Sequence, residues 1–238
     1  MSGDVMNAAT GPELSTAGLA RRQLHFILAV DCSGSMMGER IASLNYAVRS
    51  AIPAMRAAAA DNPENDVLVR VLRFADEVKW TVETPVPVDQ FEWTDLTAGG
   101  ETNMGAAFVA LAEALTPEKM PGRQLPPVLV LLSDGLPTDD AEAGLAAFMR
   151  SPFGAKAIRL AVAIGSDADK ALLQSFIGNS DVKPLQANSA ETLVDRIKWT
   201  ASVPMKAASA PVGSSADNVQ NLAQGVASEN ENGGELVW

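Results

Sequence analysis

The sequence predicts an α/β fold in which a mostly parallel sheet is covered by helices on both faces. Short apolar runs of strand length alternate along the chain with stretches whose apolar residues recur every three or four positions, as on one face of a helix. Polar residues rarely interrupt the strand-like runs, which is typical of parallel strands buried on both faces. This alternation is the pattern of consecutive β-α-β units.

The expected elements extend from residue 24 to residue 199. A strand at 24–30 precedes a helix whose apolar stripe runs from Ile41 to Met55. The later elements are expected as strands at 67–74 and 78–82, a helix at 104–115, a strand at 127–132, a helix at 141–149, a strand at 158–164, a helix at 168–176, a short strand at 182–185 and a helix at 189–199. The stretch 84–100, rich in Pro and Asp, is expected to be irregular.

The chain has 238 residues, of which 47% are apolar, and this is sufficient for one large hydrophobic core. We expect a flexible leader at 1–21, a folded domain at 22–202 and a disordered acidic tail at 203–238, since both ends are rich in small polar residues without periodicity. The sequence contains no apolar run of about eighteen residues and no signal-peptide pattern. We therefore expect a cytoplasmic protein with no membrane contact.

Composition also narrows the function. With 18 Lys and Arg against 29 Asp and Glu, the formal net charge is −11, which argues against nucleic acid as a partner. His25 is the only histidine, so most histidine-based catalysis is excluded; it lies in an apolar run and is expected to be a packed or partly exposed strand residue. The single cysteine, Cys32, excludes an intramolecular disulfide and is expected to point into the core.

A group of oxygen-bearing side chains follows the first strand. Asp31, Ser33 and Ser35 occupy alternate positions in the loop, so one carboxylate and two hydroxyls can turn toward the same point. Oxygen ligands of this kind favour Mg²⁺, Mn²⁺ or Ca²⁺, and the lack of nearby His or Cys donors argues against zinc.

Two further polar segments are expected at the same edge of the sheet. The Gly-rich segment 99–105 contains Thr102 and opens a helix, and the segment 133–135 places Asp134 directly after the central strand. Each is weak evidence alone, because Thr102 could simply cap its helix and Asp134 could simply open a turn. Together with the first loop they predict a cation site at the carboxyl ends of the strands.

In this order, the three segments resemble the metal-ion-dependent adhesion site of von Willebrand factor type A domains, over residues 22–202. The resemblance implies a doubly wound, Rossmann-like sheet, a divalent cation with Mg²⁺ as first choice, and no catalysis. It implies that the metal ligands are Asp31, Ser33, Ser35, Thr102 and Asp134, with Ser33 and Ser35 binding directly, Thr102 binding directly in the ligand-bound state, and the aspartates binding directly or through water. A protein partner would then fill the open coordination position with a carboxylate.

One feature departs from the family pattern. Many members run from Gly-Gly straight into the threonine, whereas Glu101 intervenes here. Either the loop is one residue longer, or Glu101 brings another carboxylate near the cation. Among family members, the acidic single-domain character is most similar to bacterial TerY-like proteins of tellurium resistance and stress response. That similarity implies cytosolic partners, including a protein kinase and a phosphatase of the same system.

Two alternatives remain open. The first is a Mg²⁺-dependent phosphoryl-transfer enzyme with Asp31 as nucleophile, although such enzymes place a second acid two residues later, where this chain has Ser33. The second is a module of the same fold that has lost its metal. A nucleotide-binding P-loop is absent from the sequence, and a serine nucleophile would need His25 as its base, several residues before the site.

Overall fold

The computed structural model describes residues 21–209. Its centre is a six-stranded sheet with the order β3-β2-β1-β4-β5-β6. The strands are β1 (Arg22–Asp31), β2 (Asn65–Phe74), β3 (Val78–Pro87), β4 (Val128–Ser133), β5 (Ile158–Ile164) and β6 (Leu185–Ala187). Every neighbouring pair is parallel except β2 and β3, which are antiparallel. The predicted doubly wound, mostly parallel α/β sheet is confirmed.

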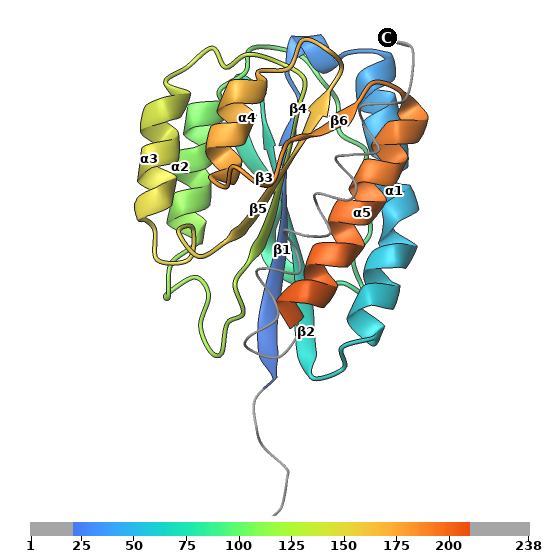
Figure 1. Ribbon diagram of the computed structural model, residues 1–238, viewed down its shortest axis with the longest axis vertical. Coiled ribbons are helices and arrows are strands. Elements are labelled where there is room, and N and C mark those ends of the chain that lie inside the picture. Colours follow the sequence, from blue (N-terminus) through green and yellow to red (C-terminus); the bar gives the residue numbers. More distant parts are fainter. Residues whose placement is uncertain (1–20, 210–238) are drawn as a thin grey trace, which may run out of the picture.

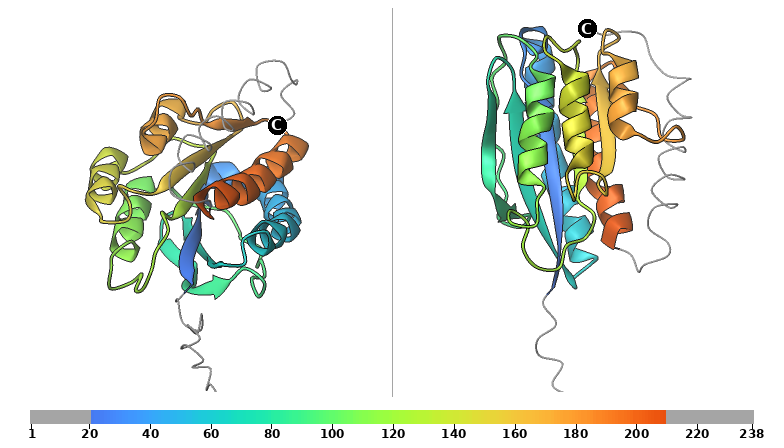
Figure 2. Two further views of the ribbon diagram at one scale, coloured as in Figure 1. Left: turned by 60° about the horizontal axis from the view of Figure 1, so that its bottom comes forward. Right: turned by 90° about the vertical axis from the view of Figure 1, so that its left-hand side faces the viewer.

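Helices cover both faces of the sheet (Figures 1 and 2). They are α1 (Glu39–Ala60), α2 (Met104–Ala114), α3 (Ala141–Arg150), α4 (Lys170–Ile177) and α5 (Ala190–Ser209), with a short 3-10 helix, η1 (Gly34–Met36). Helices α1 and α5 pack on one face, and α2, α3 and α4 pack on the other. Alternate residues of β1 belong to the two cores, because successive side chains of a strand point to opposite faces.

Several boundaries differ from those expected, most clearly those of β3, β6 and α5. Strand β3 continues to Pro87, because it is an edge strand whose outer side needs no backbone donor and so accepts proline. Strand β6 begins at Leu185, directly after Pro184, which cannot donate to the strand ladder. Helix α5 continues to Ser209, so the expected domain end at 202 falls inside it. The expected leader up to residue 20 and the expected tail from residue 210 lie outside the described residues.

The strand order fixes where a ligand can bind. The chain moves from β1 outward through β2 to β3, and then returns to the other side of β1 with β4. The carboxyl ends of β1 and β4 therefore form the switch point of the sheet, where open α/β folds bind their ligands. Cys32 is buried as predicted, with 0% of its surface exposed, and His25 is packed rather than partly exposed, with 1% exposed. Within the described residues, none of the helices combines the length and apolar character needed to cross a membrane.

Candidate metal site

Backbone hydrogen bonds bring the first two polar loops together. Asp31 is the last residue of β1, and the loop after it is joined to the Gly-rich loop by two bonds. The Gly34 N–H donates to Gly100 O at 2.8 Å, and the Gly99 N–H donates to Cys32 O at 2.8 Å. Gly100 has φ +86°, a conformation that favours glycine. The expected meeting of these segments at one sheet edge is therefore present.

The side chains of the first loop meet those that follow β4. Ser35 Oγ donates to Asp134 Oδ1 at 2.7 Å, and Ser33 Oγ lies 3.0 Å from Ser35 Oγ. Asp31 is held in place from two sides, because its Oδ1 accepts from the Ser33 N–H at 2.9 Å and its Oδ2 accepts from Ser133 Oγ at 2.6 Å. Ser133 is a further member of this network, to which the sequence pattern assigned no role.

The hydroxyls of Thr102 and Ser35 both lie close to Gly135. A Cβ atom at position 135 would lie 3.3 Å from Ser35 Oγ and 3.8 Å from Thr102 Oγ1. The threonine is 5% exposed, and its N–H donates to Thr138 Oγ1 at 3.0 Å. Glu101, in contrast, is exposed, and its N–H donates to Asp76 Oδ1 at 2.6 Å. The structure therefore brings the hydroxyl of Thr102 close to Gly135, whereas Glu101 is exposed.

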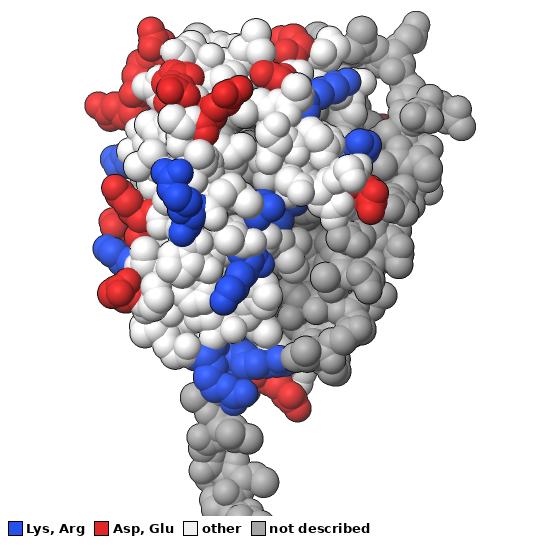
Figure 3. Space-filling model, turned by 60° about the vertical axis from the view of Figure 1, so that its left-hand side comes forward, with Lys and Arg blue, Asp and Glu red and all other residues white. Residues whose placement is uncertain are grey.

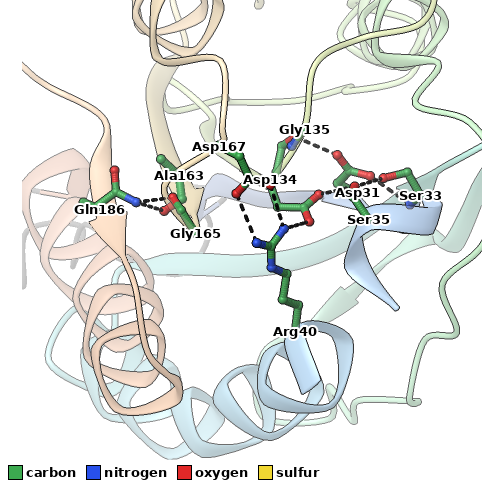
Figure 4. Close-up of polar contacts among 11 residues, drawn as sticks. Asp31, Ser33, Ser35, Arg40, Asp134, Gly135, Ala163, Gly165, Asp167 and Gln186 are labelled. Atoms are coloured by element: carbon green, nitrogen blue, oxygen red, sulfur yellow. Dashed lines mark hydrogen bonds and ion pairs between the residues drawn. The ribbon is translucent and has the colours of Figure 1, made fainter. Parts of the chain in front are cut away.

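A cationic side chain that the sequence analysis missed also reaches the site. Arg40 stands in the first turn of α1 and points between two acidic side chains (Figure 4). Its Nη1 donates to Asp134 Oδ2 at 2.5 Å, and its Nη2 donates to Asp167 Oδ1 at 3.0 Å. Asp167 follows β5, so the rule that loops after parallel strands share one edge could have found it. No local pattern could have shown that Arg40 turns toward that edge.

The electrostatics of the site favour an additional cation. The side chain of Asp134 is fully buried, and Asp31 is 0% exposed. Burial raises the pKa of Asp31, hydrogen bonds from Ser133 and Ser33 oppose that rise, and the nearby charge of Asp134 adds to it. Arg40 is shared between Asp134 and Asp167, so one guanidinium faces two carboxylates. The buried charge of Asp31 has no contact with that guanidinium.

The donor set fits a hard divalent cation. Within residues 21–209 there is no cluster of three or more His, Cys, Asp or Glu side chains arranged to hold a metal. A cation at this edge would instead meet the three hydroxyls of Ser33, Ser35 and Thr102 together with two carboxylates. This all-oxygen set suits Mg²⁺, Mn²⁺ or Ca²⁺, and Gly135 places no Cβ atom beside the hydroxyls of Ser35 and Thr102.

Solved structures share this architecture at low sequence identity. An ArnB paralog named VWA2, from Sulfolobus acidocaldarius, has a TM-score of 0.54 and 17% identity over 74% of this chain and 44% of that chain. A von Willebrand factor type A structure from Catenulispora acidiphila has a TM-score of 0.57 and 15% identity over 77% of this chain and 43% of that one. The chain has the von Willebrand factor type A fold.

The pilus adhesin SpaC of Lactobacillus rhamnosus GG also has this fold, with a TM-score of 0.59 and 14% identity over 77% of this chain and 30% of the adhesin. The chain thus matches less than half the length of each of these three structures. No family model matches the sequence, and none of the curated proteins is significantly similar to it. The shared property is the type A fold.

Proposed function

We propose that this type A domain is a protein-binding module, and that it binds an acidic residue of its partner through a divalent cation. The observation that carries the proposal is that Ser35 contacts both Ser33 and Asp134 at the switch point of the sheet. Asp31 and Thr102 complete the ligand set. The expected ion is Mg²⁺, with Mn²⁺ or Ca²⁺ able to replace it. Neutral hydroxyls supply most of the donors, so an anion from outside is favoured to complete the coordination shell.

The surface around the site suits a protein partner. Met37 is 63% exposed and lies two residues after Ser35, and Leu136 is 64% exposed and directly follows Gly135. Exposed apolar residues beside a polar anchor are common at protein interfaces. Acidic side chains gather at the upper end of the face covered by α2, α3 and α4, which is the same end as the site (Figure 3). Such an acidic edge attracts cations and repels an acidic partner unless a cation intervenes.

The biological setting is part of the proposal. One structure of the same fold is named as a pilus adhesin, which supports a role in binding rather than catalysis. We place this chain in the cytoplasm, in a bacterial stress-response system of the tellurium-resistance type, on its resemblance to TerY-like proteins. In that setting a protein kinase or phosphatase of the same system is the expected kind of partner. The net charge of −11 supports a protein rather than nucleic acid or an anionic membrane.

The competing function is Mg²⁺-dependent phosphoryl transfer from Asp31. The position two residues later holds Ser33, which cannot act as the second acid of such an enzyme. His25 is 1% exposed within β1, so it is not available to a substrate as a base. A phosphatase assay with a generic phosphomonoester, run with and without Mg²⁺, tests this alternative. Turnover that depends on both Mg²⁺ and Asp31 would favour the enzyme over the binding module.

The metal site is tested by calorimetric titration with Mn²⁺ and with Mg²⁺. Ser35→Ala removes one exposed hydroxyl of the site and is expected to weaken binding about tenfold. The matched control is Ser175→Ala, because Ser175 is also exposed and its hydroxyl only bonds Ala171 O within α4. Wild type and the control should bind alike. Equal affinity of Ser35→Ala and wild type, or no binding by wild type, would overturn the proposed site.

A further inference from the structure

The guanidinium of Arg40 lies in a space beside Gly165 and Asp167, which are distant from it in the sequence. Gly165 follows β5 with φ +78°, and a Cβ atom there would lie 2.8 Å from Arg40 Nη2 and 2.8 Å from Asp167 Oδ1. Glycine is therefore required twice at this position, by the backbone conformation and by the space that the guanidinium occupies. The side chain of Arg40 is only 16% exposed.

Hydrogen bonds to strand β6 hold the loop that contains Gly165 and Asp167. The Gly165 N–H donates to Ala187 O at 2.8 Å. Gln186 Nε2 donates to Ala163 O at 3.1 Å and also to Gly165 O (Figure 4). These bonds fix the backbone just before Asp167. The Asp167 carboxylate, which contacts Arg40, is therefore held in place by its loop. The arginine is thus positioned from both sides by elements distant in sequence.

The two oxygens of Asp134 have different partners. Oδ1 accepts from Ser35 and faces the hydroxyl group of the proposed metal site, whereas Oδ2 is bound by Arg40. We propose that Arg40 is the internal cation of this site: it compensates Asp134 when no divalent ion is bound, and it lowers the affinity of the site for a divalent ion. This inference rests on the proposed function, because it concerns the same metal site.

Two physical effects lead to this conclusion. A buried carboxylate without a positive partner is strongly destabilising, so Arg40 makes the fold independent of a bound metal. A guanidinium on one oxygen of a ligand carboxylate also repels a divalent cation on the other oxygen. At the effective dielectric of a protein surface, such a repulsion corresponds to about tenfold or more in affinity. A weak site of this kind holds its cation best when a carboxylate of a partner is bound as well.

The experiment compares three substitutions in the full chain. Arg40→Gln removes the internal cation, and Arg40→Lys keeps a positive charge at the same position. Arg49→Gln is the matched control, since Arg49 lies on the exposed side of the same helix and pairs with Asp95. Mn²⁺ affinity is measured by calorimetry, and thermal unfolding is measured in chelator and in saturating Mn²⁺. The unfolding measurement needs no knowledge of the partner or of any activity.

The proposal predicts that Arg40→Gln binds Mn²⁺ about tenfold or more tightly than wild type. In chelator the variant should melt at a lower temperature than wild type. Mn²⁺ should raise the melting temperature of the variant more than that of wild type. Arg40→Lys and Arg49→Gln should bind Mn²⁺ like wild type. If Arg40→Gln folds only with Mn²⁺ present, the two cations replace each other and the proposal is supported; failure to fold in both conditions would overturn it.

Two other results would overturn the proposal in distinguishable ways. If wild type binds Mn²⁺ and Arg40→Gln binds it equally or more weakly, the metal site stands and the competition by Arg40 is wrong. If neither protein binds Mn²⁺, the proposed metal site itself is wrong and the competition fails with it.

Discussion

The stability of this protein should depend on pH through its single histidine. His25 lies in β1 with 1% of its surface exposed, and neither ring nitrogen has a hydrogen-bond partner among the described residues. Burial, together with the positive charge of Arg70, lowers the pKa of His25 to about 4, from the ordinary value of 6.5. The folded protein therefore keeps this imidazole neutral under conditions in which the unfolded chain is already protonated.

Proton linkage gives the sign and the size of the change in the free energy of unfolding with pH. Between the two pKa values the unfolded state binds more protons than the folded state, so the free energy of unfolding falls as the pH falls below 6.5. The loss is about 2 kcal/mol at pH 5 and reaches about 3 kcal/mol below the folded pKa. Asp31, whose pKa is raised, acts in the opposite direction, because protonation of a buried carboxylate relieves its burial cost as the pH falls.

Urea unfolding followed by tryptophan fluorescence measures this effect. Wild type and His25→Leu are compared at several pH values from about 7.5 to about 5. Both proteins contain Asp31 and the other carboxylates, so the difference between their pH profiles isolates the histidine. We expect wild type to lose about 2 kcal/mol more than the variant over this range. Parallel profiles would refute the reasoning, because they would show that His25 titrates alike in the folded and unfolded states.

Three further predictions concern packing and the metal. Gly135→Ala places a Cβ atom 3.3 Å from Ser35 Oγ, so calorimetry should show weaker Mn²⁺ binding, with little change in the melting temperature. Unchanged affinity would contradict a place for Gly135 in the site. Gly144→Ala brings a Cβ atom within 2.3 Å of Gly105 O, where α3 packs against α2. Urea unfolding should therefore show a free energy of unfolding lower by about 1–3 kcal/mol. A variant as stable as wild type would show that the two helices can move apart without cost. Chelator should lower stability only by the lost binding, about 2.7 kcal/mol when the ion was at 100 times its Kd, and global unfolding in chelator would contradict a metal-independent core.

Local patterns determined the class of the fold and the main residues of the candidate site. The apolar run that became β1 is buried almost throughout, and this burial on both faces is why its sequence lacks the alternation of a half-exposed strand. Because parallel strands end at one edge, the positions of Asp31 and Asp134 after their strands were enough to predict that they approach each other. The length of β3 was not predictable in the same way, since Pro87 is acceptable in a strand only if that strand lies at the edge.

The tertiary structure alone decided how the charges of the site are paired. Arg40 is 94 positions from Asp134 and 127 positions from Asp167, and Ser133 is 102 positions from Asp31. Helical periodicity tells which face of α1 is buried, but the direction of a long polar side chain in its first turn depends on which loop comes to lie beside it. Strand order and the glycine at position 165 settled that question, because they place an acidic loop, with room for a guanidinium, next to the start of α1.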